Sequence, residues 1–369
     1  MKQDVVIQNS NQISENCCGC GACLAVCPVK GIKIIEKERG ALYYIQNENC
    51  IHCNKCRLIC PMQNDKDLFH RKNESFYQAK TNNIEVLKKS SSGGIAYEVA
   101  SYFLQCVGGI VYGAGWDYSC QQVQHQRVVE IADLHILQGS KYVHSAISPD
   151  IYHNILRDVQ NRKVLFLGTP CQVASVRKYV KDSLNLFSID LICHGVPSAK
   201  LLSEQLVHIT RNKISNISFR QGINFILSCS DEKGSVFCVD GLDNPYYSLF
   251  LRFASLRESC YSCKYACQER VGDISLGDFV ENGIGYSCVI PNTKEGEILL
   301  NKLVMVSKET KPIDLLRDNH AFNMPTQKHP RTEFFTRLYK KYGLIKSYKI
   351  SFLDIIFKRK IKKLLLLLR

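Results

Sequence analysis

Two runs of cysteines near the N-terminus share one spacing, C-x2-C-x2-C-x3-C, and each run is followed directly by a proline. The first run comprises Cys17, Cys20, Cys23 and Cys27. The second run comprises Cys50, Cys53, Cys56 and Cys60. Thiolates are soft ligands that suit iron-sulfur clusters, and a cubane takes four of them. The two runs therefore predict two [4Fe-4S] clusters.

The order of the cysteines also predicts how the two clusters share their ligands. In this bacterial two-cluster pattern, the fourth cysteine of each run binds the other cluster. We expect one cluster to be held by Cys17, Cys20, Cys23 and Cys60. We expect the other to be held by Cys27, Cys50, Cys53 and Cys56. Cys18 falls outside the pattern and is expected to be a packed or half-exposed residue. Two four-cysteine zinc sites would satisfy the count but fit the spacing poorly.

Composition indicates an intracellular protein with more than one domain. A chain of 369 residues with 45% hydrophobic residues can bury sizeable cores. Nineteen cysteines would also suit a secreted disulfide framework, but the first 16 residues contain no apolar signal segment. No run reaches the roughly 18 apolar residues that span a bilayer. We expect a reducing, cytoplasmic environment.

The positive charge is concentrated at the C-terminal end. Residues 340–369 contain ten basic residues and one acidic residue, a net +9 of the +14 of the whole chain. The remainder is only mildly basic, so a nucleic-acid partner is not expected. Apolar residues at helical spacing, followed by lysines, predict an amphipathic helix in 350–368. Such a helix suits peripheral contact with the inner membrane surface, or it docks on the α/β domain or on a second subunit.

The pattern of apolar runs predicts four regions of different character. We expect a ferredoxin-like α+β domain with two clusters over 12–66, a linker over 67–75, an α/β domain over 76–305 and a helical basic region over 306–369. Strand-like runs alternate with helical ones after Ser75, which predicts a mostly parallel sheet with helices on its faces. Shorter strand-like runs between 213 and 239 predict antiparallel additions.

Individual elements of the α/β domain are predicted from their local pattern. Buried strands are expected in 108–116, 163–168 and 184–193, where apolar residues are continuous. One helix is expected to follow the Gly-Gly turn at 93–94, and another to begin after Ser198 as its N-cap.

Further cysteines lie where open α/β sheets place their chemistry, beyond the ends of strands. Cys171 follows the strand expected at 163–168, and Cys193 ends the next strand. The segment SCYSCKYAC then contributes Cys260, Cys263 and Cys267. These residues fit a third cluster site. Buried free cysteines that pack as small apolar side chains are an equal alternative.

A family resemblance supports the first of these alternatives. From about Ser75 to Phe279 the chain resembles the beta-subunit family of coenzyme F420 hydrogenases and dehydrogenases, and the similar module of hydroxymethyl chlorophyll a reductase. The shared segments are SSGG, GSKYVHS, GTPCQ, LICHGVPS and SCYSCKYACQERVGDISLGDF. Residues 12–66 resemble a bacterial-type ferredoxin. Many members of the family have Gly-Asp-Phe-Trp-Gly where this chain has Val280 and Glu281 after Phe279.

The resemblance implies further cofactor sites. It implies FAD and a third [4Fe-4S] cluster held by Cys171, Cys193, Cys260 and Cys263, with Cys267 as a spare. The helix start at Ser92, Gly93 and Gly94 suits the FAD pyrophosphate because helix N-termini attract anions. The remaining flavin contacts are expected at Lys141, Tyr142, Ser145 and Thr169. Alternatively, Lys141 is a solvated surface lysine and SGG a plain helix start.

These features together predict an iron-sulfur flavoprotein oxidoreductase. It is expected to move electrons between ferredoxin-type carriers and an organic substrate, through three [4Fe-4S] clusters and FAD. The first alternative is a coenzyme F420-linked dehydrogenase module that oxidises reduced F420 and passes the electrons out through the ferredoxin domain. The second is an electron-transfer subunit without a substrate pocket. By analogy alone, the substrate is expected to be sugar- or lipid-linked. The sequence assigns no catalytic residue.

Overall fold

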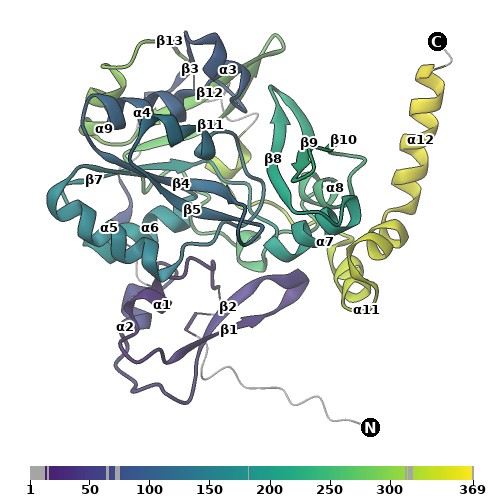
Figure 1. The fold of residues 1–369 in the computed structure, drawn as a ribbon, viewed down its shortest axis with the longest axis horizontal. Helices are drawn as coiled ribbons and strands as arrows, with labels where there is room; N and C mark the ends of the chain where they lie inside the picture. Colours follow the sequence, from purple (N-terminus) through teal and green to yellow (C-terminus); the bar gives the residue numbers. More distant parts are fainter. Residues whose placement is uncertain are drawn as a thin grey trace.

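The structure is a computed structural model that describes residues 13–14, 16–63, 66–70, 75–181, 183–311, 314 and 319–367. Parts of the expected linker, of both ends of the ferredoxin region and of the C-terminal region lie outside these residues. The described chain forms a small N-terminal unit, a large mixed sheet with helices on both faces, a three-stranded sheet, and two C-terminal helices (Figure 1).

The N-terminal unit has two short helices and a hairpin. Its elements are α1 (Ala22–Val26), β1 (Ile32–Glu36), η1 (Glu38–Gly40), β2 (Leu42–Gln46) and α2 (Lys55–Ile59). Strands β1 and β2 pair antiparallel. In each cysteine run the third cysteine lies in the helix and the fourth is its C-cap, in extended conformation. The repeated spacing therefore produces the same local structure twice.

The large sheet has the strand order β13-β3-β12-β11-β7-β6-β4-β5. Its strands are β3 (Tyr77–Thr81), β4 (Ile110–Asp117), β5 (Gln122–Val128), β6 (Val164–Gly168), β7 (Leu186–Leu191), β11 (Ile274–Glu281), β12 (Ile284–Pro291) and β13 (Met305–Glu309). Only the pairs β4–β6, β6–β7 and β7–β11 are parallel in the described sheet, and the outer pairs are antiparallel.

The expectation of a mostly parallel sheet is therefore wrong, because hairpins flank the parallel centre. Strands β11 and β12 are joined at Asn282 and Gly283, which have φ values of 52° and 76°. Positive φ at both positions is what a tight type I′ hairpin requires, and Asn-Gly is its commonest sequence. The antiparallel strands expected between 213 and 239 are present, and they form a separate sheet.

Helices cover both faces of the large sheet. On one face lie α5 (Pro149–Asn161) and α6 (Pro170–Val180), and on the other α4 (Ile95–Gln105), η3 (Ile131–Leu137) and α9 (Lys294–Leu300). The short helix α3 (Ile84–Lys88) follows β3. Side chains alternate between the two cores with the strand period of two: Phe166 packs with α5 and α6, whereas Leu165 packs with α4.

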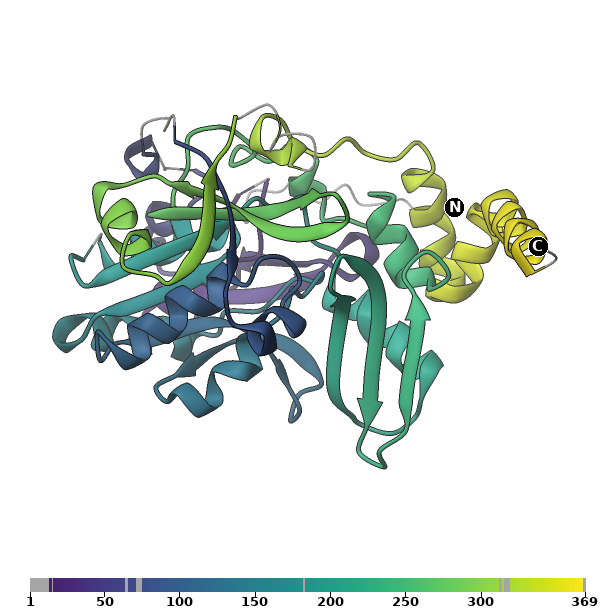
Figure 2. The same ribbon diagram turned by 90° about the horizontal axis from the view of Figure 1, so that it is seen from above.

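A second body stands beside the large sheet and is seen clearly in Figure 2. It contains α7 (Ala199–Ile209), β8 (Ile214–Gln221), β9 (Asn224–Asp231), β10 (Val236–Asp240), α8 (Pro245–Leu251) and α11 (Thr332–Ser351). Strands β8 to β10 form an antiparallel three-stranded sheet. Helix α7 begins as expected, since the Ser198 hydroxyl accepts from the Leu201 N–H at 3.3 Å. Short helical turns lie at η2 (Lys66–Leu68), η4 (Glu258–Cys260) and η5 (His320–Phe322).

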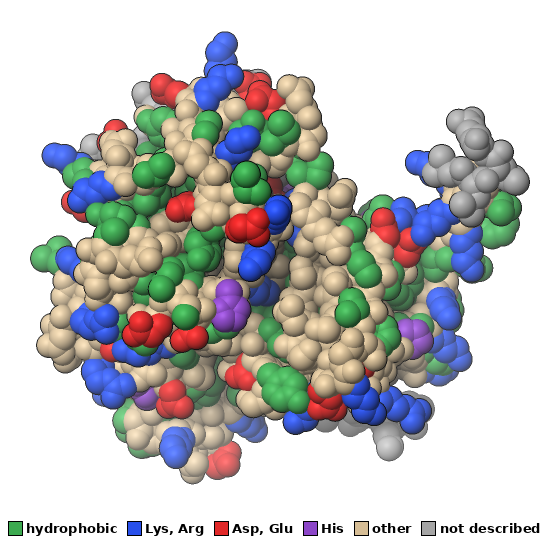
Figure 3. Space-filling model, turned by 45° about the horizontal axis from the view of Figure 1, so that its top comes forward, with side chains coloured by type: hydrophobic (Ala, Val, Ile, Leu, Met, Phe, Trp, Pro, Cys, Tyr) green, Lys and Arg blue, Asp and Glu red, His purple; other side chains and the backbone are tan. Residues whose placement is uncertain are grey.

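The last helix, α12 (Leu353–Leu367), projects from the body (Figure 1). Arg359 pairs with Asp240 at 2.6 Å and also contacts Asp243, which lies just after β10. Figure 3 shows Lys and Arg side chains along this projecting arm. Among the described helices, none combines the length and the apolar character that crossing a membrane requires.

Candidate iron-sulfur and flavin site

Two cavities in the N-terminal unit divide the eight cysteines of the two runs. One cavity, of about 300 Å³ including space open to solvent, is lined by Cys17, Cys20, Cys23 and Cys60, here called the inner set. The other, of about 290 Å³, is lined by Cys27, Cys50, Cys53 and Cys56, here called the outer set. Each cavity thus receives three cysteines from one run and the fourth from the other.

The donors at both cavities fit a [4Fe-4S] cluster. Each set offers four thiols, and the rest of the walls combines apolar residues such as Ile32 and Ala22 with polar ones such as Gln46 and Tyr44. Deprotonated ligands of a cubane would supply the negative charge that iron requires. Among the described residues, no group of three or more His, Cys, Asp or Glu side chains is gathered closely enough to hold a single metal ion. All nineteen cysteines are free.

Burial makes an uncompensated thiolate unfavourable at the inner set. Burial raises the pKa of the Cys23 thiol well above its usual value, and the neighbouring charges of Cys20, Cys17 and Cys60 raise it further. Burial also raises the pKa of Cys60, to about 12. A cationic centre bound here would offset both effects, since metal binding deprotonates its thiol ligands.

A third group of cysteines meets where the large sheet faces the N-terminal unit. This third set comprises Cys171 in the first turn of α6, Cys193 just after β7, Cys260 in η4 and Cys263 after it. Burial raises the pKa of Cys193 well above its usual value, and the neighbouring charges of Cys260, Cys171 and Cys263 raise it further. The four expected ligands are therefore neighbours. Cys267 lies apart, and its thiol contacts the Glu269 carbonyl oxygen at 3.2 Å.

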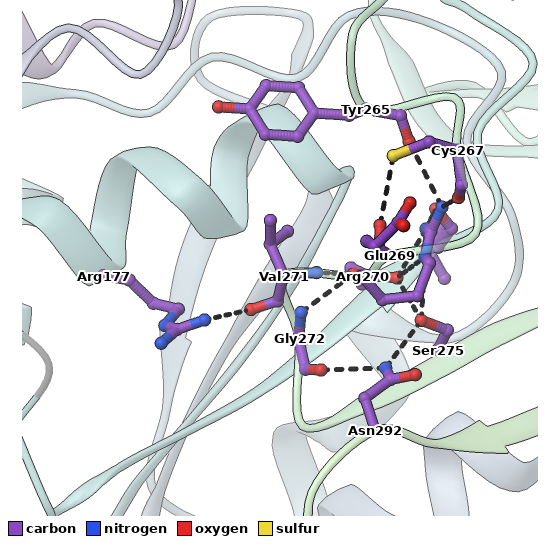
Figure 4. Close-up of polar contacts among 11 residues, drawn as sticks. Arg177, Tyr265, Cys267, Glu269, Arg270, Val271, Gly272, Ser275 and Asn292 are labelled. Atoms are coloured by element: carbon purple, nitrogen blue, oxygen red, sulfur yellow. Dashed lines mark hydrogen bonds and ion pairs between the residues drawn. The ribbon is translucent and has the colours of Figure 1, made fainter. Parts of the chain in front are cut away.

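A buried ion pair fixes the loop that carries Cys260 and Cys263. Arg270 and Asp190 have side chains that are 1% and 0% exposed, and Nη2 lies 2.6 Å from Oδ1. Asp190 also accepts from the backbone N–H groups of Val271 and Gly272. Arg177 of α6 donates to the Val271 carbonyl oxygen at 2.7 Å (Figure 4). Because Asp190 belongs to β7, these bonds hold together the three segments that bear the third set.

Buried donors hold the inner set against the third set. The Arg257 guanidinium donates to the Cys17 carbonyl oxygen at 3.0 Å and also to that of Leu42. The Ser259 hydroxyl donates to the same Cys17 oxygen at 3.1 Å. From the other side, the Tyr152 hydroxyl donates to the Cys20 carbonyl oxygen at 2.9 Å. Arg257 therefore lies between the two sets of thiols.

Arg257 was not among the residues predicted from the sequence. Burial lowers the pKa of its guanidinium, but the negative charges of Cys17, Tyr43 and Cys260 outweigh this and raise it overall. Its position three residues before Cys260 is the only local signal, and one arginine beside a cysteine is a weak one.

The expected pyrophosphate site lies at the start of α4. Gly94 is the N-cap, and the Ser92 hydroxyl lies 3.3 Å from that of Ser287 in β12. A Cβ atom on Gly93 would approach the Ala79 carbonyl oxygen to 2.1 Å. Close packing against β3 and β12 therefore requires glycine at this position, whatever ligand the helix start binds.

Two of the other expected flavin contacts lie beside this helix start. The Ser140 N–H donates to the Ser91 hydroxyl at 2.8 Å, so the two segments are neighbours. Lys141 Nζ donates to the carbonyl oxygens of Leu137 and Gln138, each at 2.8 Å. Burial lowers the pKa of Lys141 to about 7, whereas the carbonyl oxygens favour its charged form. The alternative of a solvated lysine does not describe this side chain.

Ser145 and Thr169 lie instead beside the third set. The Gln172 side chain links them: its Nε2 donates to Ser145 Oγ at 3.1 Å, and its Oε1 accepts from Thr169 Oγ1 at 3.0 Å. Thr169 Oγ1 also lies 3.2 Å from Cys171 Sγ. The expected flavin contacts thus form two groups, one at the helix start and one at Cys171.

Sequence reasoning missed a buried cation next to the first group. Arg220, at the end of β8, donates to the Tyr142 hydroxyl at 3.0 Å and to the Ser91 carbonyl oxygen at 3.1 Å. It also pairs with Asp278 at 3.1 Å. Asp278 belongs to the Gly-Asp-Phe segment, and this segment was the one sequence feature that could have drawn attention to Arg220.

Comparison with known proteins gives two family matches. Residues 16–64 match the 4Fe-4S dicluster domain, and residues 161–314 match the C terminus of the coenzyme F420 hydrogenase/dehydrogenase beta subunit. The second range contains all four cysteines of the third set.

A curated relative and a solved structure are similar to the chain. The coenzyme F420 hydrogenase subunit beta of Methanococcus voltae is 26% identical over 250 residues, which cover 64% of this chain and 83% of the relative. A chain of the xenon-derivatised F420-reducing [NiFe] hydrogenase complex of Methanosarcina barkeri matches with 19% identity and a TM-score of 0.46, covering 77% of this chain and 92% of that one. The resemblance expected from the motifs is confirmed: the chain is similar to the 4Fe-4S dicluster domain over 16–64 and to the coenzyme F420 hydrogenase/dehydrogenase beta-subunit family over 161–314.

Proposed function

We propose that the chain is an iron-sulfur flavoprotein oxidoreductase that moves electrons between a ferredoxin-type carrier and an organic substrate. The observation that carries the proposal is the order of the three cysteine sets. The outer set contains the exposed Cys53, the inner set contains three buried cysteines, and Arg257 and Ser259 join the inner set to the third set. Such a series suits transfer from a surface carrier to an interior site.

The proposed cofactors are three [4Fe-4S] clusters, one at each set, and one FAD. When bound, clusters exchange single electrons and a flavin converts between single electrons and electron pairs. The FAD pyrophosphate is proposed at Ser92–Gly94, with Lys141 and Tyr142 beside it. Ser145 and Thr169 extend the same site toward Cys171, and their shared bonds to Gln172 support this direction.

The chain's own residues supply positive charge at the proposed flavin site. Lys141 is oriented by two carbonyl oxygens, and Arg220 by Tyr142, Asp278 and the Ser91 carbonyl oxygen. Because these bonds restrict both side chains, their cationic groups are already in place before a ligand binds. They would favour a ligand that carries or gains negative charge.

A second candidate function follows from the family match over 161–314. Since relatives are named as F420 hydrogenase subunits, the chain is alternatively a module that exchanges electrons with coenzyme F420. In a further alternative it carries electrons for a larger complex and has no substrate of its own. A cytoplasmic location is proposed in each case.

Anaerobic reconstitution tests the cofactor content. Three cubanes predict about twelve irons per chain, and Cys171→Ala should reduce this to about eight. Cys267→Ser is the matched control and should retain the full content. An iron content near eight per chain in the wild type, unchanged in Cys171→Ala, would overturn the third cluster.

Reduction of the bound flavin distinguishes the two candidate functions. Under anaerobic conditions, reduced coenzyme F420 and reduced ferredoxin are each added to the reconstituted protein while the flavin absorbance is followed. Faster reduction by ferredoxin supports the main proposal, and faster reduction by F420 supports the alternative.

Ser92→Glu should prevent FAD binding through charge repulsion, while Ser101→Glu, farther along α4, should not. Equal FAD content in both variants would refute the placement.

We also propose that α12 lies on an anionic membrane surface, which would suit a lipid-linked substrate. Its exposed apolar side chains follow helical spacing, with Leu353 66% and Phe357 64% exposed. The lysines at 358, 360 and 362 are exposed beside them. Apolar side chains flanked by lysines are typical of helices that bind anionic lipid.

Vesicle cosedimentation tests the membrane proposal. Because Phe352 is fully buried, the chain should be truncated after this residue and not before it. Binding to phosphatidylserine vesicles that salt weakens, and that truncation removes, supports the proposal. Equal binding with and without α12, or none to either, would refute it.

A further inference from the structure

Four segments that are far apart in the sequence meet at the Arg220 guanidinium. Its side chain is 4% exposed, and each of its three nitrogens has an acceptor. Nε donates to the Gly222 carbonyl oxygen in the β8–β9 turn, and Nη2 donates to the Ser91 carbonyl oxygen ahead of α4, each at 3.1 Å. Nη1 donates to the Tyr142 hydroxyl at 3.0 Å and to Asp278 Oδ2 in β11 at 3.1 Å. Because a buried charge is costly unless it is paired and hydrogen-bonded, these contacts hold the four segments in one arrangement.

Tyr142 is held by the second body, although it lies in the segment that carries Lys141. Its ring stacks on Phe250 of α8 with the centroids 4.9 Å apart, and the Tyr246 hydroxyl donates to its carbonyl oxygen at 2.7 Å. The adjacent Lys141 is held from elsewhere, since its ammonium donates to the Leu137 carbonyl oxygen at the end of η3. The two neighbouring residues are therefore fixed by different parts of the chain, and a shift of Tyr142 would displace Lys141.

The β8–β9 turn lies next to the helix start at Ser92. Arg220 and Phe225 are cross-strand partners on either side of this turn, and the guanidinium carbon lies 4.2 Å from the centroid of the Phe225 ring. A Cβ atom on Gly285 of β12 would lie 3.1 Å from Ile223 Cγ2 and 3.8 Å from Ser92 Cα. The turn and the helix start thus approach the same point of β12, so the second body reaches the helix start from outside the large sheet.

We propose that Arg220 is a positioning residue of the flavin site, which holds the segment 140–142 and the turn ahead of α4 in a fixed relative position. The second body thereby completes a site whose other parts belong to the large sheet. This inference rests on the proposed function because it concerns FAD bound at Ser92–Gly94. Arg220 acts through the segments that it joins and not by contact with the flavin. A site ordered in advance binds its ligand more tightly, because less freedom is lost on binding.

Replacement of Arg220 by lysine separates position from charge. Arg220→Lys keeps the positive charge, but its single ammonium cannot reach acceptors on all four segments. Arg220→Met removes both the charge and the contacts. Arg127→Met is the matched control, because Arg127 of β5 also pairs with a carboxylate, that of Asp158 in α5, at 2.7 Å.

The first readout is the dissociation constant of FAD, measured by titration of iron-loaded, flavin-free protein. We expect FAD to bind about tenfold more weakly to both Arg220→Lys and Arg220→Met, since a weak hydrogen-bond network and the lost ordering each have effects of this size. Arg127→Met should bind FAD as the wild type does. Iron content should not change, because the hydrogen bonds that Arg220 makes in the described chain include none to a cysteine.

The second readout is hydrogen exchange of the flavin-free proteins, followed by mass spectrometry. The Ser140 N–H donates to the Ser91 hydroxyl at 2.8 Å, so this bond reports whether the two segments stay together. Exchange should be faster over 90–96 and 138–145 in both Arg220 variants and unchanged over α5.

The outcomes separate this inference from the proposed function. If the wild type binds no FAD, the proposed function fails and this inference fails with it. If the wild type binds FAD and Arg220→Lys binds it equally well, only the positioning role is refuted; this variant decides the matter even if Arg220→Met does not fold. Weaker FAD binding without faster exchange refutes the role, because the segments have not moved. An equal loss of FAD affinity in Arg127→Met also refutes it.

Discussion

The inner and outer cysteine sets arise from the same spacing but lie in different surroundings. In the inner set, Cys17, Cys20 and Cys23 are all buried. In the outer set Cys53 is exposed, Cys27 and Cys50 are half-buried and only Cys56 is buried. Local sequence therefore determines which thiols converge, while packing against the rest of the chain determines how accessible they are.

The difference follows from what each run contacts beyond its own unit. The first run meets Arg257, Ser259 and Tyr152, which donate to its backbone. The second run is tied to the body mainly at its end, where Lys178 donates to the Cys60 carbonyl oxygen and Tyr265 to that of Pro61. Under the proposed function, the outer set would meet a soluble carrier and the inner set would pass electrons inward.

Loss of a single ligand should have the largest effect and should differ between the sets. Cys23→Ala and Cys53→Ala should each remove about four of about twelve irons. Cys23→Ala should also lower the thermal midpoint much further, because binding energy at a buried site is folding energy and the emptied site adjoins the main core. Iron analysis and calorimetry of the anaerobic proteins measure both effects. Equal midpoints for the two variants would contradict the difference in burial.

Chelation should separate the sets in time. With an oxidant and a chelator present, the outer cluster should be lost first, since its ligands are exposed. We expect a fast phase that releases about four irons per chain and a slower release of the rest. The EPR signals recorded after the fast phase should be those of Cys53→Ala. Two results would contradict the difference in exposure between the sets. One is release of all the iron in a single phase, and the other is loss, during the fast phase, of the EPR signal that Cys23→Ala lacks.

Sequence reasoning was strongest where structure is local. The spacing of the two runs predicts two groups of four cysteines, and the two cavities are lined by the same groups, because neighbouring thiols in short loops leave few alternatives. Ser198 as a helix cap was equally predictable. The β11–β12 hairpin could also have been found from Asn282-Gly283, and overlooking it contributed to the wrong expectation of a mostly parallel sheet.

The missed features depend on residues far apart in the chain. Asp190 and Arg270 form their ion pair across 80 positions, and Arg257 reaches Cys17 across 240. Nothing in the immediate neighbourhood of these residues specifies the partner. The packing of Cys18 in one buried cluster with Cys171 was missed for the same reason, since Cys171 becomes its neighbour only when the N-terminal unit packs on α6.

Removal of Arg257 should weaken the contact between the inner set and the segment that carries Cys260. Arg257→Leu leaves the half-buried Leu42 carbonyl oxygen without this donor and leaves the Cys17 carbonyl oxygen with Ser259 as its side-chain donor. At about 1–3 kcal/mol for an unsatisfied group, we expect a loss of about 1–3 kcal/mol in the free energy of unfolding. Chemical denaturation measures the change, with the exposed Lys33→Ala as control. A loss no greater than that of the control would show that Arg257 does not hold the two sets together.

The smallest expected effect concerns the carrier that meets the outer set. Lys55 is exposed at the mouth of the outer cavity, and Lys30 and Lys33 are exposed in the same unit. An acidic ferredoxin would be attracted to these charges, which act mainly on the association rate. Lys55→Glu should therefore slow reduction by such a ferredoxin by about two- to fivefold at low ionic strength and have little effect at high salt. Stopped-flow mixing measures this rate, and Lys89→Glu, an exposed lysine outside the N-terminal unit, is the matched control. If both variants slow the reaction equally, or if the effect of Lys55→Glu persists in high salt, the carrier does not approach through the outer set.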